Sequence, residues 1–226
     1  HILVKQNGII AGVELAKRIF KKVDKKIKLT QYLEDGEKVN EGDIIFKIIG
    51  SAHSILKSER LILNCMQRMS SIASHTNEIC QLLKNTKTKI LDTRKTTPLN
   101  RIIEKWAVRI GGGINHRFGL YDMIMIKDNH IDFVGNVKNA IINTKKYIKH
   151  HNLDLKIIVE ARNLKEVNEI IQEGEINRIL LDNFNYQNTK EAVKIINGRY
   201  ETESSGNITQ KNVLNYAKCG VDYVSI

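Results

Sequence analysis

Several residue types are scarce in this chain of 226 residues. It contains one proline and three cysteines, and aromatic residues make up only 6% of it. A single proline argues against long linkers or disorder. Three cysteines cannot all pair, and Cys65, Cys80 and Cys219 lack the close spacing of a metal site. We therefore expect a globular protein of a reducing compartment, the cytoplasm.

Long apolar runs and a signal peptide are also missing, so no membrane association is expected. The chain begins at His1 and not at a methionine, and we expect it to be a fragment. Its 36 basic and 25 acidic residues give a net charge of +11, which suits nucleic acid, an anionic membrane or small anionic substrates. The basic residues are spread out and rarely alternate with aromatic ones, which disfavours nucleic acid. A basic nucleic-acid-binding module remains an alternative.

The apolar fraction of 42% is sufficient for a proper core. Residues 1–53 look like a small mixed α/β sandwich, and residues 54–88 like a connecting region with one long helix or two abutting helices, Ser54 to Lys84. The sandwich is expected to contain two short strands around a turn at Asn7-Gly8, a helix from Val13 to Val23, and strands at Ile27–Tyr32 and Ile44–Ile49.

Residues 89–226 alternate between apolar strands and helical patterns. The expected strands are Lys89–Leu91, Met123–Ile126, Lys156–Val159, Arg178–Leu181, Tyr200–Thr202 and Tyr223–Ile226. The expected helices between them are Val134–His150, Leu164–Gln172, Tyr186–Ile196 and Thr209–Lys218. This alternation predicts a parallel sheet. About six strands are fewer than the eight of a full barrel, so the fold class is α/β with an open or irregular parallel barrel as catalytic domain.

The stretch from Asp92 to Ile131 combines many cations with many glycines. A short helix, Asn100–Ile110, precedes the triple glycine Gly111–Gly113, which suggests a chain that passes close to something else. Its cations lie at predicted strand and loop ends and suit a small polyanion: Arg94, Lys95, His116, Arg117 and Lys127. The alternative is a basic surface loop. His130 is expected to be structural.

Polar residues follow the later strands as well. Glu160 follows the third strand, Asp182 the fourth, and Glu203 and Ser205 the fifth. The carboxyl ends of parallel barrel strands open on one face, so these groups should meet the cations there. The pattern predicts an anion site with two or more carboxylates. Structural ion pairs of the cations with Glu160 or Asp182 are one alternative, and Asp182 as a helix cap is another.

Four motifs in this region, in order and in register, resemble the quinolinate phosphoribosyltransferase family: TRKTTP, KWAV, GGGINHRFGLYD and IKDNHI. This is the carboxylating nicotinate-nucleotide pyrophosphorylase family, of the type II phosphoribosyltransferases. The resemblance runs from VKQNGIIAG near the start to GVDYVSI at the end. It implies transfer of a phosphoribosyl group from phosphoribosyl pyrophosphate to quinolinate, with decarboxylation, to give nicotinate mononucleotide, pyrophosphate and CO2 in NAD biosynthesis.

The resemblance also implies site residues, Mg²⁺ as cofactor and a homodimer or higher oligomer with shared sites. Arg94, His116, Arg117 and Lys127 would hold quinolinate, and Arg60 would reach into the neighbouring subunit's site. The remaining substrate-binding residues would contact phosphoribosyl pyrophosphate: Thr93, Lys95, Glu160, Asp182, Ser205, Gly206 and Asn207. Glu160 and Asp182 would also bind the metal. The catalytic residues would be Lys95, Lys127, Glu160 and Asp182.

Three positions depart from the family pattern, which usually has glycine where Ser71, Leu99 and Asn207 stand. Asparagine tolerates a left-handed backbone, so the turn at Asn207 should survive. We expect the Ser205–Asn207 loop to lie at a helix N-terminus as a phosphate cradle, with Thr209 as a possible N-cap. Two enzyme alternatives remain: a molybdenum-associated paralogue that acts on another heteroaromatic acid, and a Schiff-base aldolase that uses Lys127.

Overall fold

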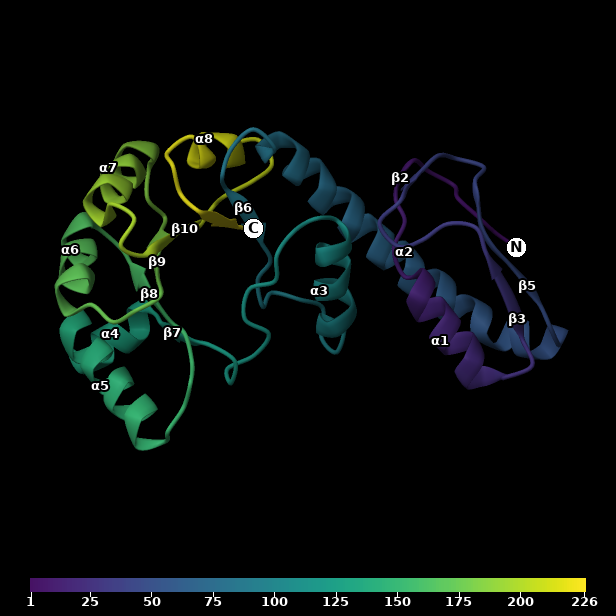
Figure 1. The fold of residues 1–226 in the computed structure, drawn as a ribbon, viewed down its shortest axis with the longest axis horizontal. Coiled ribbons are helices and arrows are strands. Elements are labelled where there is room, and N and C mark those ends of the chain that lie inside the picture. The colour runs from purple at the N-terminus through teal and green to yellow at the C-terminus, as the bar shows by residue number, and fades with distance from the viewer. The chain divides into compact units, whose positions relative to one another are not determined.

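The computed structural model describes all 226 residues, which form two compact units (Figure 1). Unit 1 contains His1–Gln81 and Lys95–Asn115, and unit 2 contains Leu82–Arg94 and His116–Ile226. Residues 95–115 therefore pack with the N-terminal part of the chain. The domain limits of 1–53, 54–88 and 89–226 stay a prediction. No helix is both long and apolar enough to cross a membrane.

Unit 1 contains two small antiparallel sheets. In the first, β5 (Ile44–Ile49) lies between β1 (Ile2–Leu3) and β3 (Lys28–Gln31); in the second, β2 (Gly8–Ile9) pairs with β4 (Lys38–Val39). The two short strands predicted around Asn7-Gly8 are present, but they do not pair with one another, because β1 pairs with β5 and β2 with β4. Strand β4 was missed, because its two residues lie inside a turn-rich segment.

Two helices cover these sheets. Both α1 (Val13–Val23) and the unbroken α2 (Ala52–Leu83) agree with the prediction. Phe20 of α1 packs edge-on against Phe46 of β5, with ring centroids 6.2 Å apart. The Ser74 hydroxyl of α2 accepts a hydrogen bond from the Ile9 amide at 2.8 Å, which fixes β2 on the helix.

The triple glycine lies where α3 (Arg101–Ile110) ends against α2. A Cβ on Gly111 would lie 2.7 Å from Thr76 Cβ, and one on Gly113 would lie 2.9 Å from Thr76 Cγ2. Gly112 has a φ of 96°, which side chains rarely adopt. The predicted close approach is confirmed, and the neighbour is helix α2.

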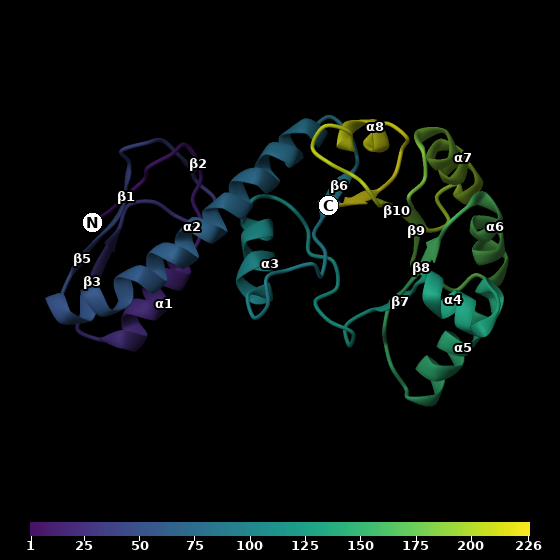
Figure 2. The same ribbon diagram turned by 180° about the vertical axis from the view of Figure 1, so that it is seen from behind.

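Unit 2 is built on six parallel strands in the order β6-β11-β10-β9-β8-β7. The strands are β6 (Lys89–Leu91), β7 (Ile124–Ile126), β8 (Ile157–Ala161), β9 (Arg178–Asp182), β10 (Glu201–Ser205) and β11 (Tyr223–Ser225). The helices lie on the outer face of this curved sheet in both views (Figures 1 and 2): α4 (Asp128–Val134), α5 (Val137–His150), α6 (Leu164–Glu173), α7 (Tyr186–Ile196) and α8 (Val213–Ala217). The predicted open α/β barrel of six strands is confirmed, and its two edge strands are β6 and β7.

Several boundaries differ from the prediction. Strands β8 and β10 extend further, so Glu160, Glu203 and Ser205 lie within strands and not after them. Polar residues concealed these strand ends, because burial overrides the low strand propensity of glutamate. The helix expected from Val134 to His150 starts only at Val137, because Gly135 takes a φ of 90° and ends α4.

Candidate active site

Strand register brings the predicted carboxylates to one edge of unit 2. Glu160 pairs with Leu180, Leu180 with Glu203, and Asp182 with Ser205. Residues in register on neighbouring strands point to the same face of a sheet. The prediction that the strand ends gather carboxylates on one side is therefore confirmed for Glu160, Asp182 and Glu203.

Glu160 and Lys127 form an ion pair at this edge. Lys127 directly follows β7, and its Nζ lies 3.8 Å from Glu160 Oε2, which belongs to a buried side chain. Burial raises the pKa of the Glu160 carboxyl, Asp182 and Asp128 raise it further, and Lys127 and Arg162 oppose them. The neighbouring cations therefore compensate the Glu160 carboxylate only in part. Such a carboxylate suits a metal ion or a cationic transition state.

Asp182 is the last residue of β9, and its Oδ2 accepts a hydrogen bond from the side-chain amide of Asn183 at 2.8 Å. The interpretation of Asp182 as a helix cap was wrong. Asn185 caps α7 instead, because its side-chain oxygen accepts a hydrogen bond from the backbone N–H of Asn188 at 2.8 Å. Asp182 therefore stays available at the carboxyl edge, on the same side as Glu160.

Two arginines of unit 2 lie close enough to repel one another. Arg117 has its pKa lowered, first by burial and next by the charge of Arg94, and Asp122 opposes both effects. The Nε of Arg94 is buried without a hydrogen-bond partner in the protein. An anion between the two guanidinium groups would satisfy that donor and relieve the repulsion. The pair thus has the properties of a carboxylate-binding site.

His116 lies next to these arginines, buried and held on several sides. Its backbone N–H donates to Asp92 Oδ1 at 2.8 Å, and its Nδ1 accepts from the Arg117 N–H at 2.6 Å. Its Nε2 lies 3.4 Å from Oε2 of Glu203, which is completely buried. Glu203 also accepts from Arg178 at 2.9 Å. The sequence predicted Glu203 at this edge without a role and did not single out Arg178; a charged residue inside an otherwise buried strand was the available signal.

The Ser205–Asn207 loop follows β10. Gly206 and Asn207 both take left-handed backbones, with φ of 93° and 53°, so the expectation that asparagine would sustain the turn is confirmed. The expectation of a helix N-terminus here was wrong, because α8 begins only at Val213 and is five residues long. Thr209 is not its N-cap; its backbone N–H donates to Asn212 Oδ1 in a turn that precedes the helix.

The remaining predicted site residues are divided between the units. Thr93 belongs to unit 2, whereas Lys95 and Arg60 belong to unit 1, and both of their side chains are exposed. The loop after Lys95 is anchored by Glu104, which is buried, accepts from Arg68 at 2.9 Å and accepts from the Thr97 N–H at 3.3 Å.

Two further expectations concern individual side chains. Leu99, where the family usually has glycine, adopts a left-handed φ of 65° with its side chain fully exposed. His130 is structural, as expected, because its Nδ1 accepts from the Lys127 N–H at 2.9 Å and caps α4.

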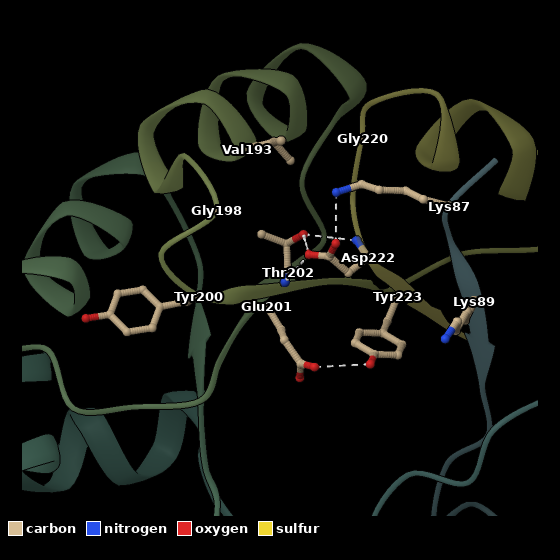
Figure 3. A pocket seen from close by; sticks show the side chains of 10 residues that line it. All are labelled: Lys87, Lys89, Val193, Gly198, Tyr200, Glu201, Thr202, Gly220, Asp222 and Tyr223. Atoms are coloured by element: carbon tan, nitrogen blue, oxygen red, sulfur yellow. Dashed lines mark hydrogen bonds and ion pairs between the residues drawn. The ribbon is translucent and has the colours of Figure 1, made fainter.

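A pocket of about 310 Å³ lies at the opposite, amino-terminal ends of β6, β10 and β11 (Figure 3). It contains an ion pair between Lys87 and Asp222 at 2.8 Å and a hydrogen bond from the Tyr223 hydroxyl to Glu201 at 3.1 Å. In a parallel barrel this face serves stability, whereas chemistry occurs at the carboxyl ends. The candidate active site therefore remains at Glu160, Asp182 and the arginine pair.

Comparisons with known proteins identify the family of this chain. Residues 1–70 match the N-terminal domain of quinolinate phosphoribosyl transferase, and residues 72–226 match its C-terminal domain. The chain is 43% identical to quinolinate phosphoribosyltransferase [decarboxylating] 2, mitochondrial, of Nicotiana glauca, over 100% of this chain and 68% of that protein. It is 38% identical to the probable nicotinate-nucleotide pyrophosphorylase [carboxylating] of Bacillus subtilis, over 100% of this chain and 77% of that protein.

Solved structures give the same answer. The crystal structure of NadC from Streptococcus pyogenes superposes with a TM-score of 0.93 at 38% identity, over 99% of this chain and 78% of that one. The nicotinate-nucleotide pyrophosphorylase from Francisella tularensis does so with the same TM-score of 0.93 and 38% identity, over 99% and 78% of the two chains. Matched along its whole length, with cations and carboxylates gathered at the carboxyl edge of its parallel strands, this chain belongs to the quinolinate phosphoribosyl transferase family.

Proposed function

We propose that this protein transfers a phosphoribosyl group from phosphoribosyl pyrophosphate to quinolinate and decarboxylates the product. The observation that carries the proposal is the pair Arg94 and Arg117, two neighbouring guanidinium groups beside a buried carboxylate edge. Their repulsion and the buried Nε of Arg94 without a partner favour a ligand with more than one carboxylate. The relatives named above carry the same activity in their names.

In this proposal Arg94, Arg117 and Lys127 hold the two carboxylates of quinolinate. Guanidinium groups bind carboxylates bidentately, so they fix the plane of the ring as well as its charge. The ring nitrogen is thereby directed at the anomeric carbon. A new N–C bond forms there while the C–O bond to pyrophosphate breaks. The nitrogen then carries positive charge and stabilises the electron pair that stays on the adjacent ring carbon when the carboxylate on that carbon leaves as CO2. A proton added to this carbon completes the reaction.

Glu160 and Asp182 serve the ribose and metal side. The described residues contain no group of three or more metal-ligating side chains, but Mg²⁺ commonly takes only one or two carboxylates in addition to substrate phosphates. A buried Glu160 coupled to Asp182 fits that role. When bound, Mg²⁺ would supply positive charge against the leaving pyrophosphate. The carboxylates themselves stabilise a ribose that becomes oxocarbenium-like.

The remaining residues bind the phosphates. Lys95 offsets charge on the pyrophosphate, and Thr93 assists on the same substrate. The left-handed turn of Gly206 and Asn207, after Ser205, presents backbone N–H groups to the 5-phosphate. This nest of amides takes the place of the helix N-terminus that was expected there.

Three further features complete the proposal. Arg60 completes the quinolinate site of a neighbouring subunit, so the enzyme works as a homodimer or larger oligomer.

The cytoplasm is the proposed location, on the basis of three cysteines that form no disulfide. Nucleic acid has no place in this function, and the family membership gives the nucleic-acid-binding alternative no support.

The direct test is turnover by the purified protein. Quinolinate and phosphoribosyl pyrophosphate with Mg²⁺ should give equal amounts of nicotinate mononucleotide and CO2. Other heteroaromatic acids should react poorly; efficient use of one of them instead of quinolinate would favour the paralogue. Borohydride with substrate should trap no covalent adduct, because trapping on Lys127 would indicate the aldolase. Leaving out Mg²⁺ or adding a chelator should abolish turnover while quinolinate still binds.

A further inference from the structure

We infer that Glu203 is a positioning residue of the quinolinate site, and that it acts through His116 by fixing the orientation of this imidazole, with Nδ1 toward the Arg117 N–H and Nε2 toward Glu203. The inference rests on the proposed function, since quinolinate defines the site. It adds a supporting role for His116, which accepts the Arg117 N–H, to the contact with quinolinate expected for this residue.

The hydrogen bonds of His116 define its tautomer. Its Nδ1 lies 2.6 Å from the Arg117 backbone nitrogen, which can only donate. Nδ1 must therefore be the unprotonated, accepting nitrogen. The proton belongs on Nε2, which lies 3.4 Å from Oε2 of Glu203, a group that can only accept when ionised. Both ring nitrogens thus face protein groups, although Nε2 is close to Glu203 without forming a hydrogen bond to it.

The charges around Arg178 indicate that Glu203 interacts with His116 as well as with Arg178. Arg178 already has a carboxylate partner, because its Nε and Nη2 donate to Glu201 Oε2 at 3.1 and 2.9 Å. Glu203 adds a second carboxylate at 2.9 Å from Nη1 of Arg178, although Glu203 is completely buried. A buried charge destabilises the fold unless an opposite charge and hydrogen bonds compensate it. One arginine between two carboxylates leaves negative charge in excess, and that excess faces the His116 Nε2–H.

The consequence reaches the arginine pair through the backbone. His116 is anchored at its own N–H by Asp92 and at its ring by Glu203, and it then accepts the N–H of Arg117. The main chain of Arg117 is therefore fixed at the residue whose guanidinium lies near Arg94. Loss of the Glu203 contact frees the ring to rotate, releases the Arg117 N–H and lets its guanidinium move away from the orientation that binds quinolinate.

A first experiment tests the tautomer without any assay of function. Nitrogen NMR of the protein labelled in its seven histidines should show His116 with an unprotonated Nδ1 and a protonated Nε2, with the resonance assigned by its loss in His116→Asn. In Glu203→Met the Nε2 proton should exchange with water faster. A protonated Nδ1 in the wild type would overturn the inference.

A second experiment uses matched variants on one strand. Glu203→Met removes the carboxylate contact that orients His116 and should weaken quinolinate binding about tenfold, while it leaves the KM for phosphoribosyl pyrophosphate within about threefold. The control is Glu201→Met, which removes the other carboxylate from Arg178 but touches no histidine; it should leave quinolinate binding within about threefold by the same measure. Glu203→Gln keeps an acceptor for Nε2–H and should restore most of the affinity.

The double variant decides the route of the effect. His116→Asn keeps an acceptor near the Nδ1 position but cannot reach Glu203. If Glu203 acts through His116, Glu203→Met adds little to His116→Asn. Additive losses, or equal losses in the Glu201→Met control, would overturn the inference. If Glu203→Met does not fold, the NMR experiment on the wild type decides it. A wild type without quinolinate turnover would count against the proposed function, and the tautomer would still be tested.

Discussion

The Nζ of Lys127 lies 3.8 Å from Oε2 of Glu160, so the cation after β7 and the carboxylate of β8 meet at one edge. The structural ion pair considered from sequence is therefore present. It does not exclude a functional role, because Lys127 is half exposed and Glu160 keeps a raised pKa through burial despite the lysine. The pair is a resting arrangement that a bound anion and a metal can separate.

Replacing Glu160 by alanine should lower turnover far more than it weakens quinolinate binding. In the proposed function Glu160 serves the ribose and metal side, while Arg94 and Arg117 bind the ring. Steady-state kinetics together with direct titration of quinolinate separate the two effects. Equal losses in turnover and binding would show that Glu160 does not act on the ribose and metal side of the site.

Replacing Arg94 by lysine should not be conservative. The charge remains but the bidentate fork is lost, so quinolinate affinity should fall by about 1–3 kcal/mol. Calorimetric titration measures this loss, and Arg109→Lys, on an exposed position of α3, is the control that should change nothing. Nicotinate, with one carboxylate, should be a poor substrate of both forms; use of nicotinate as readily as quinolinate would refute the dicarboxylate site.

Arg60 and Lys127 should complement one another across subunits. Arg60→Ala and Lys127→Ala should each be nearly inactive alone, because each removes one cation from every shared site. After subunit exchange, half of the dimers are mixed and each has one intact site, so activity should reach roughly a quarter of the wild-type value. The measurement is nicotinate mononucleotide formation after mixing, with exchange followed by native mass. Exchange without recovery would mean that Arg60 acts within its own chain or only packs.

Asp222→Asn should destabilise the protein at neutral pH but not in acid. Burial raises the pKa of Asp222, but hydrogen bonds from Lys87 and Thr202 outweigh it and hold the pKa below 3.8. The ionised group therefore stabilises the fold above pH 3.8, and this contribution disappears as the pH falls through the folded pKa. Removing it should cost about 1–3 kcal/mol at pH 7.

Urea unfolding at several pH values measures this difference, which should shrink as the pH falls below 3.8 and through the lowered folded pKa. Asp154→Asn, at an exposed position without these hydrogen bonds, is the control. A difference that stays constant with pH would show that Asp222 stabilises the fold through packing and not through its charge.

Leu99→Gly should stabilise the protein slightly. Leu99 holds a left-handed φ of 65° and buries none of its side chain, so glycine relieves strain of about 1–2 kcal/mol and loses no packing. The greater freedom of glycine in the unfolded chain offsets part of this, leaving a gain of about 0.5–1 kcal/mol. Urea midpoints measure it. Leu120→Gly, exposed but without a positive φ, should destabilise instead; the same sign in both variants would refute the strain argument.

The sequence by itself determined the architecture and predicted which polar residues lie at the carboxyl edge of the sheet. Alternation of apolar strands with helical patterns predicted the open parallel barrel, because the two periods differ and each must bury one face. The polar residues at the ends of β6 to β10 predicted the anion site, because parallel strands share one carboxyl edge. Asn207 was correctly expected to sustain its turn, since its backbone preference is local.

Only the tertiary structure decided the pairing of β1 and β2 with distant strands and the late start of α8. Local propensity does not determine which remote segment satisfies a short strand or where a helix ends against its neighbours. It also decided the contact of Glu203 with His116 and Arg178. These three residues are far apart in the chain, and the completely buried carboxylate meets its partners only when β9, β10 and the loop at His116 come together.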